Sequence, residues 1–109
     1  MSLQESDKAA AAVAVAPRVT LANIENSIAR RYDTTADRAL GDLDEPALRL
    51  LSICILVMKN GFTVIGKSAP ASPGNFNAEL GKKFAYEDAV RQLWPLMGFA
   101  LREKLHAAL

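Results

Sequence analysis

Residues that can bind an anion follow the apolar segment 63–65 and lead into a predicted helix. The loop Ser68–Asn75 brings the chain to that helix start, where free backbone N–H groups and the positive end of the helix dipole favour negative charge. We therefore predict a ligand-binding set made of Lys67, Ser68, Ser72, Asn75, Phe76, Lys82, Arg91 and Arg102. The alternative is ordinary capping of the helix by Asn75 or Asn77.

Two other residues, His106 and Cys54, have side chains that often carry chemistry. A single histidine makes neither a catalytic triad nor a metal site by itself. Cys54 lies among aliphatic residues, whereas a reactive thiol needs an electropositive and partly exposed setting, so we expect it to be buried and inert. With no recognisable nucleophile–base or carboxylate pair, the sequence predicts no enzyme, no metal and no cofactor.

Length and charge limit the remaining functions. The chain has 109 residues, enough for one domain, and a formal net charge of +1, which gives no strong global field toward nucleic acid or an anionic membrane. The longest apolar run, 53–58, is too short to cross a bilayer. Glu5 and Asp7 precede the alanine-rich start, unlike a signal peptide, so we expect a cytoplasmic protein that does not bind membranes.

Two apolar, β-branched runs on either side of Asn60-Gly61 predict a β-hairpin. We place the first strand at Ser52–Met58 and assign a two-residue type I′ turn, because an Asn-Gly pair tolerates positive φ at both central positions. That turn pairs Val57 with Val64. One face then carries Ile53, Ile55, Val57, Phe62 and Val64, and the other carries Cys54, Leu56, Met58 and Ile65.

Both predicted faces are apolar, and one layer of helix can cover only one of them. A lone hairpin is also marginal in water, so either more strands or a second subunit must cover the remaining face. Tyr86 and Trp94, which combine a large apolar body with a polar tip, are further contact candidates. The predicted interface is Ile53, Ile55, Val57, Phe62, Val64, Tyr86 and Trp94.

The other elements are predicted from periodicity and breakers. Residues 1–18 are expected to be a disordered tail, and 19–109 a single small α+β domain. We predict a short helix over Thr20–Arg31, an irregular connector over 32–46, and a long helix over Phe76–Leu105. Pro95 should kink that helix or divide it into a helix pair. The predicted fold is a short helix, a hairpin and a long C-terminal helix, assembled as a homo-oligomer.

Several segments together resemble a family of small phage proteins, the phage gene-49/gene-66 family. They are Asn60–Ala69, Ser72–Phe76, Gly81-Lys82, Tyr86–Ala89 and Trp94–Gly98, within about residues 50–105. The resemblance implies a phage or prophage origin and a role in the host cytoplasm. The hairpin-then-helix plan is also loosely similar to phage anti-defence proteins that inhibit Thoeris systems, which oligomerise and sequester nucleotide-derived immune signals.

Three hypotheses follow for the function. The first is a homo-oligomeric phage accessory protein, acting in counter-defence by sequestering a small anionic, nucleotide-derived signal at a subunit boundary. The second is a protein-interaction module that inhibits or adapts a host defence protein or a phage protein. The third is nucleic-acid binding, which needs basic residues clustered on one surface; the interleaved acids Glu79, Glu87, Asp88 and Glu103 argue against it.

Overall fold

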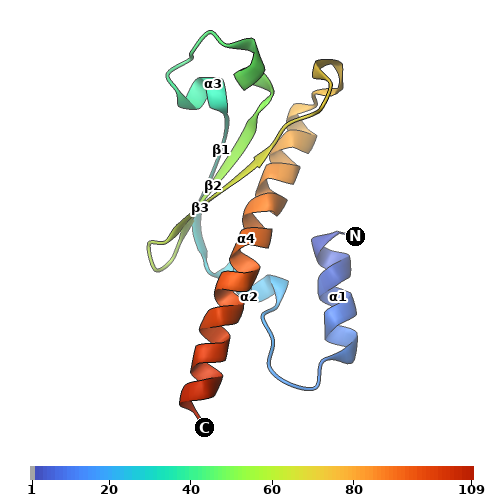
Figure 1. The fold of residues 1–109 in the computed structure, drawn as a ribbon, viewed down its shortest axis with the longest axis vertical. Coiled ribbons are helices and arrows are strands. Elements are labelled where there is room, and N and C mark those ends of the chain that lie inside the picture. Colours follow the sequence, from blue (N-terminus) through green and yellow to red (C-terminus); the bar gives the residue numbers. More distant parts are fainter. Residues whose placement is uncertain (1) are drawn as a thin grey trace.

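The computed structural model describes residues 2–109. A three-stranded antiparallel sheet is covered on one face by one long helix, which confirms the predicted α+β class (Figure 1). The helices and strands are α1 (Leu3–Val13), α2 (Leu21–Asn26), β1 (Ile28–Thr35), α3 (Ala36–Ala39), β2 (Ser52–Met58), β3 (Thr63–Ser68) and α4 (Ala78–Ala107). Short 3₁₀ helices lie at Pro46–Leu50 and Pro73–Asn75.

The core lies between the sheet and the N-terminal half of α4. Leu56 and Val90 are fully buried there, and Ile24 of α2 closes one end. Gly66 lets α4 approach β3 closely: a Cβ at this position would collide with the Ala85 carbonyl oxygen and lie 2.8 Å from the Ala89 Cβ. Small residues on both elements therefore set the spacing between helix and sheet.

The third strand, β1, is missing from the sequence prediction, which extended a helix to Arg31 and left residues 32–46 as a connector. Helix α2 begins as predicted at a Thr20 cap, where a reciprocal capping box with Asn23 satisfies backbone N–H groups. It ends at Asn26, and the chain then pairs antiparallel with β2 from Ile28 onward. Pairing with β2 provides hydrogen-bond partners that outweigh the weak local preference of this polar segment.

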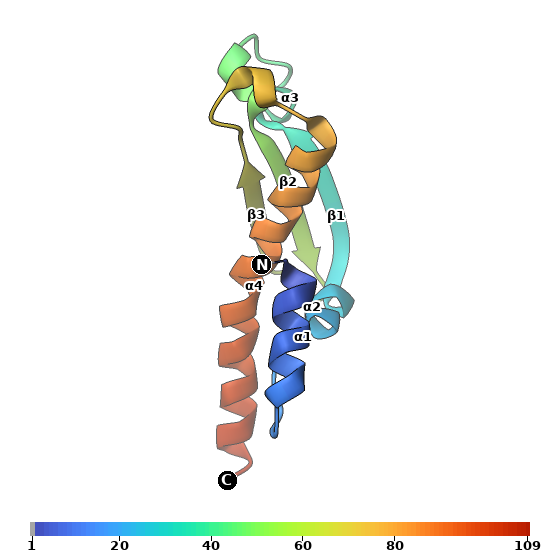
Figure 2. The same cartoon turned by 90° about the vertical axis from the view of Figure 1, so that its right-hand side faces the viewer.

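The N-terminal segment forms α1, unlike the disordered tail predicted for residues 1–18. Ser2 caps the helix by accepting a hydrogen bond from the Glu5 N–H, and Leu3 is buried. Asp7 then joins α1 to the domain: its carboxylate accepts from Arg18 Nη1 at 2.9 Å and from the Leu21 N–H at 3.2 Å. Figure 2 shows α1 lying beside the lower part of α4.

Helix α4 is continuous through Pro95, so the predicted helix pair does not form and the single long helix is confirmed. Proline removes one intrahelical hydrogen bond, and here it is exposed, so water can satisfy the freed carbonyl. The C-terminal half of α4 continues past the end of the sheet (Figure 1). Phe99, 69% exposed, lies on this projecting half.

Candidate functional site

The turn between β2 and β3 decides which side chains face away from α4. The Met58 N–H donates to the Phe62 carbonyl at 2.8 Å, and the Gly61 N–H donates to the Met58 carbonyl at 2.9 Å, which leaves a three-residue loop, 59–61. Gly61 has φ of 88°, whereas Asn60 has no positive φ and instead accepts the Phe62 N–H on Oδ1 at 2.9 Å. This is a turn with a glycine in the left-handed region at its third position, not the predicted type I′ turn.

The longer loop moves the strand pairing by one residue. Val57 pairs with Thr63 and Ile55 with Ile65, so the predicted pairing of Val57 with Val64 is wrong. A one-residue shift turns every β3 side chain to the opposite face. Val64 accordingly faces α4 and is 6% exposed, while Ile65 faces away and is 57% exposed.

Nine side chains form the sheet face that α4 leaves uncovered, which we call the open face. The two registers arrange them in three rows across β1, β2 and β3: Thr34, Ile53 and Lys67; Tyr32, Ile55 and Ile65; Arg30, Val57 and Thr63. The centre and the four adjoining positions are apolar or aromatic, and all four corners are polar. The open face is therefore an apolar cross with basic residues at two diagonally opposite corners.

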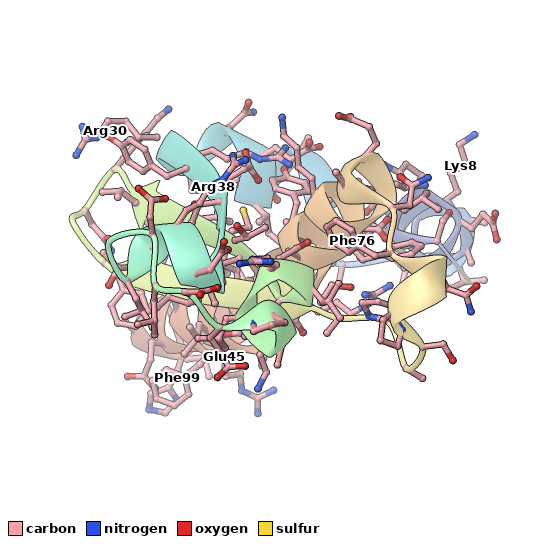
Figure 3. The ribbon with its side chains drawn as sticks, turned by 90° about the horizontal axis from the view of Figure 1, so that it is seen from above. Lys8, Arg30, Arg38, Glu45, Phe76 and Phe99 are labelled. Carbon is pink, nitrogen blue, oxygen red and sulfur yellow. The ribbon has the colours of Figure 1, made fainter. Side chains whose placement is uncertain are left out.

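Exposure confirms that this cross is available to a partner. Tyr32 is 52% and Ile65 57% exposed, and the β2 residues between them are half-buried. In Figure 3 the Arg30 side chain points away from the body of the molecule. Isolated surface apolar residues need no explanation, but five adjoining ones on one sheet face are typical of a binding surface.

Five of the predicted interface residues divide between three places. Ile53, Ile55 and Val57 lie on the open face. Val64 is part of the core, and Phe62, 53% exposed, lies at the hairpin tip. Sequence reasoning missed Tyr32 because it did not predict β1, and it missed Ile65 because of the register. The segment 28–35 has no regular alternation of apolar and polar residues, so its pattern did not predict a strand.

Tyr86 and Trp94, also predicted as interface residues, face inward and hold the chain's own segments together. The Arg31 guanidinium lies 4.1 Å from the centre of the Tyr86 ring, and the Tyr86 hydroxyl donates to Glu25 at 3.4 Å. Burial, with the Glu25 charge, raises the pKa of Tyr86 above its usual value. Trp94 Nε1 donates to the Val19 carbonyl at 3.3 Å.

The predicted ligand-binding residues do not converge on one site. Ser68, Asn75 and Phe76 line a pocket of about 170 Å³ beside the start of α4, whose cap is Asn77 and not Asn75. The remaining five lie elsewhere: Lys67 on the open face, Ser72 on the exposed loop, Lys82 on an exposed turn of α4, Arg91 in a groove against α1, and Arg102 near the C-terminus.

A larger hollow, which sequence reasoning missed, lies between the hairpin tip and α4. It has a volume of about 450 Å³, and its main side chains are Met58, Lys59, Phe62, Leu93, Leu96 and Met97. The lining is mostly apolar and carries no acid–base pair. The arrangement fits apolar contact with a ligand or a partner side chain.

The residues able to carry chemistry are isolated in the structure. Cys54 is fully buried, and burial together with the Asp33 charge raises the pKa of its thiol to about 11, so little thiolate forms at neutral pH. His106 is exposed in the last turn of α4. Within residues 2–109, no three histidine, cysteine or carboxylate side chains are grouped as a metal site would require.

Comparisons with known proteins identify the family. Among the described residues, no helix has the length and apolar character needed to cross a membrane. Searches found no matching curated protein and no matching solved structure. The family described as phage protein (N4 Gp49/phage Sf6 gene 66) matches residues 19–105, a span that reaches beyond the resemblance over 50–105 to include α2 and β1. The chain therefore belongs to the phage protein (N4 Gp49/phage Sf6 gene 66) family.

Proposed function

We propose that this phage protein is a non-catalytic accessory protein that binds a protein partner in the host cytoplasm through the open face of its sheet. The observation that supports the proposal is the apolar cross of Tyr32, Ile53, Ile55, Val57 and Ile65, which residues 2–109 leave partly exposed. Burying such a surface provides the main driving force of protein association. Binding without catalysis also agrees with the buried thiol of Cys54 and its raised pKa.

The corners of the open face indicate the chemistry of the partner. Arg30 and Lys67 lie two strands and four residue steps apart, about 17 Å at ordinary strand spacing. A matching partner has an apolar patch flanked by two acidic side chains at a similar separation. Complementary charges at the rim of an interface mainly raise the association rate and fix orientation. A host defence protein or a phage protein with that surface would be inhibited or adapted by being covered.

The test is partner capture with matched surface variants. Tagged protein expressed in phage-infected cells is cross-linked, and the captured proteins are identified by mass spectrometry. Ile65→Asp puts a charge in the exposed part of the cross, and Phe99→Asp puts the same charge on the projecting half of α4. We expect one partner that wild type and Phe99→Asp capture and Ile65→Asp loses. Equal capture by Ile65→Asp, with unchanged circular dichroism, contradicts the proposal.

A second candidate function is sequestration of a small anionic, nucleotide-derived signal. It is favoured by Ser68, Asn75 and Phe76, which line one pocket beside the α4 N-terminus. At about 170 Å³ the pocket is smaller than ordinary ligand sites and has room only for a group the size of a phosphate, so this function requires a second subunit to complete the site. Calorimetry with cyclic nucleotides and ADP-ribose isomers tests this. Saturable heat that Ser68→Ala abolishes supports it, and no heat at high micromolar concentration contradicts it.

A further inference from the structure

The two outer strands of the sheet present different edges. The Met58–Phe62 hydrogen bond fixes the alternation, so the backbone groups of Thr63, Ile65 and Lys67 point away from β2. Side chains of α4 occupy part of this β3 edge. Gln92 Nε2 donates to the Ile65 carbonyl at 2.8 Å, and the Lys67 N–H donates to the Asp88 carboxylate at 2.9 Å. Two of the outward backbone groups on the β3 edge are therefore already bonded within the chain, which makes this edge less available to another strand.

The β1 edge has no such cover. By the same alternation Arg30, Tyr32 and Thr34 pair with β2, so the backbone groups of Arg31 and Asp33 point outward. Within residues 2–109 these outward N–H and C=O groups have no hydrogen-bond partner. Figure 2 shows β1 at the margin of the molecule, with no other element beyond it. A bulge between Ile28 and Arg30 ends the regular stretch on one side, which leaves a straight edge to Thr35.

The charges on this edge select one way for two copies to pair. In an antiparallel pair centred on Tyr32, Arg31 of each copy lies opposite Asp33 of the other. Centring on Arg31 or on Asp33 instead places like charges directly opposite each other, which is destabilising. Arg31 and Asp33 already bond within the chain, with Arg31 Nε 3.0 Å from Asp33 Oδ2, so both point to the same face. In the dimer, the Arg31–Asp33 pair of one copy lies beside the same pair of the other copy. Each Arg31 then has an Asp33 next to it along its own strand and another Asp33 opposite it on the partner strand.

We propose that β1 pairs antiparallel with β1 of a second copy, with Tyr32 at the two-fold axis. The result is a six-stranded sheet in the order β3-β2-β1-β1-β2-β3. Both α4 helices then lie on one side, and the two open faces join on the other, with the two Tyr32 rings adjacent at the centre. The dimer does not depend on the proposed partner binding, but it would double the surface offered to that partner.

Reversing the charge of Arg31 or of Asp33 on the β1 edge tests this pairing. Wild-type protein is expected at twice the 11.8 kDa chain mass in sedimentation equilibrium. Arg31→Asp alone, or Asp33→Arg alone, makes both cross-strand pairs like-charged, and each should raise the dimer dissociation constant about tenfold or more. An equimolar mixture of the two variants should form a heterodimer, because every Arg then faces an Asp. The intrachain pair is lost in both variants, so recovery on mixing reports only contacts between chains.

Two further measurements separate this dimer from other assemblies. Ile65→Asp changes the open face of β3 and should leave the dimer intact, even where it abolishes partner capture. Backbone amides of Arg31 and Asp33 should be protected from hydrogen exchange in wild type and exposed in Arg31→Asp. A monomeric wild type at high micromolar concentration overturns the proposal. So does a dimer that Ile65→Asp dissociates, or one whose β1 amides exchange freely.

Discussion

Along β2 the two faces of the sheet are similarly apolar but differ in burial. Along β2 the residues Cys54 and Leu56 are fully buried beneath α4, while their neighbours Ile53, Ile55 and Val57 remain half-exposed on the open face. The strand is therefore apolar on both sides, like a strand with cover on both faces. The open side of β2 is therefore as apolar as its covered side, although no helix of residues 2–109 packs on it.

The largest expected difference between the faces is in stability. Leu56→Ala removes a fully buried side chain and should lower the free energy of unfolding by about 2–5 kcal/mol. Ile55→Ala, one residue along on the open face, should cost only about 1 kcal/mol because its side chain is already half-exposed. Guanidinium unfolding of both variants measures the difference. Equal losses would mean that the open face is covered in solution.

Thiol reactivity gives a second contrast. A pKa raised from 9.0 to about 11 lowers the thiolate fraction of Cys54 about a hundredfold, and burial blocks access as well. Cys54 should therefore react with a thiol reagent only when the protein unfolds. In an Ile55→Cys/Cys54→Ala variant, the new thiol on the open face should react at least a hundredfold faster, as measured by mass spectrometry. Similar rates at both positions would contradict the assignment of faces.

The spacing between helix and sheet depends on one glycine of the covered face. Gly66→Ala should destabilise the protein by about 1–3 kcal/mol, because its methyl group would collide with the α4 backbone at Ala85. Gly74→Ala is the matched control: nothing lies within 4 Å of its added Cβ, and a change within about 0.5 kcal/mol is expected. Thermal unfolding measures both. No cost at Gly66 would show that α4 lies further from the sheet.

The smallest expected effect is a pH-dependent loss of stability at α1, the helix that packs beside α4. It depends on the charge of the Asp7 carboxylate. The Leu21 N–H, and then Arg18, lower the pKa of Asp7 below its ordinary value of 3.8. Because the folded-state pKa is depressed, this stabilisation is fully present above pH 4 and is lost as pH falls through the folded pKa. Fluorescence of Trp94, which lines the groove beside α1, should change in that window. Asp7→Asn should remove this change.

Residue patterns correctly predicted the elements whose structure follows from residues close together in the sequence. The strand Ser52–Met58 has the predicted bounds, because its β-branched residues and the following turn agree. The long C-terminal helix and the α+β class were predicted from periodicity for the same reason. Family membership was also recognised from the sequence, although the match extends further toward the N-terminus than the motifs suggested.

Most parts of the fold and of the open face that the sequence did not predict depend on contacts between segments far apart in the chain. The hairpin loop is the local exception: Asn-Gly is compatible with two loop lengths, and the bond from the Phe62 N–H to Asn60 Oδ1 belongs to the longer one. The polar strand β1 exists because β2 pairs with it, and α1 is held by an Asp7–Leu21 contact that spans 14 residues. Tyr32 and Ile65 therefore could not be placed on the open face from local pattern.

The side chains of Asp88 and Gln92 on the β3 edge also limit how far any assembly can grow. A sheet with two free edges can add copies without end and is a template for fibres. In this protein side chains of α4 already bond two backbone groups of the β3 edge, so a strand that joins β1 uses the edge with no such bonds. These two bonds oppose further addition of strands at β3, so pairing through β1 is expected to end at two copies instead of continuing into filaments.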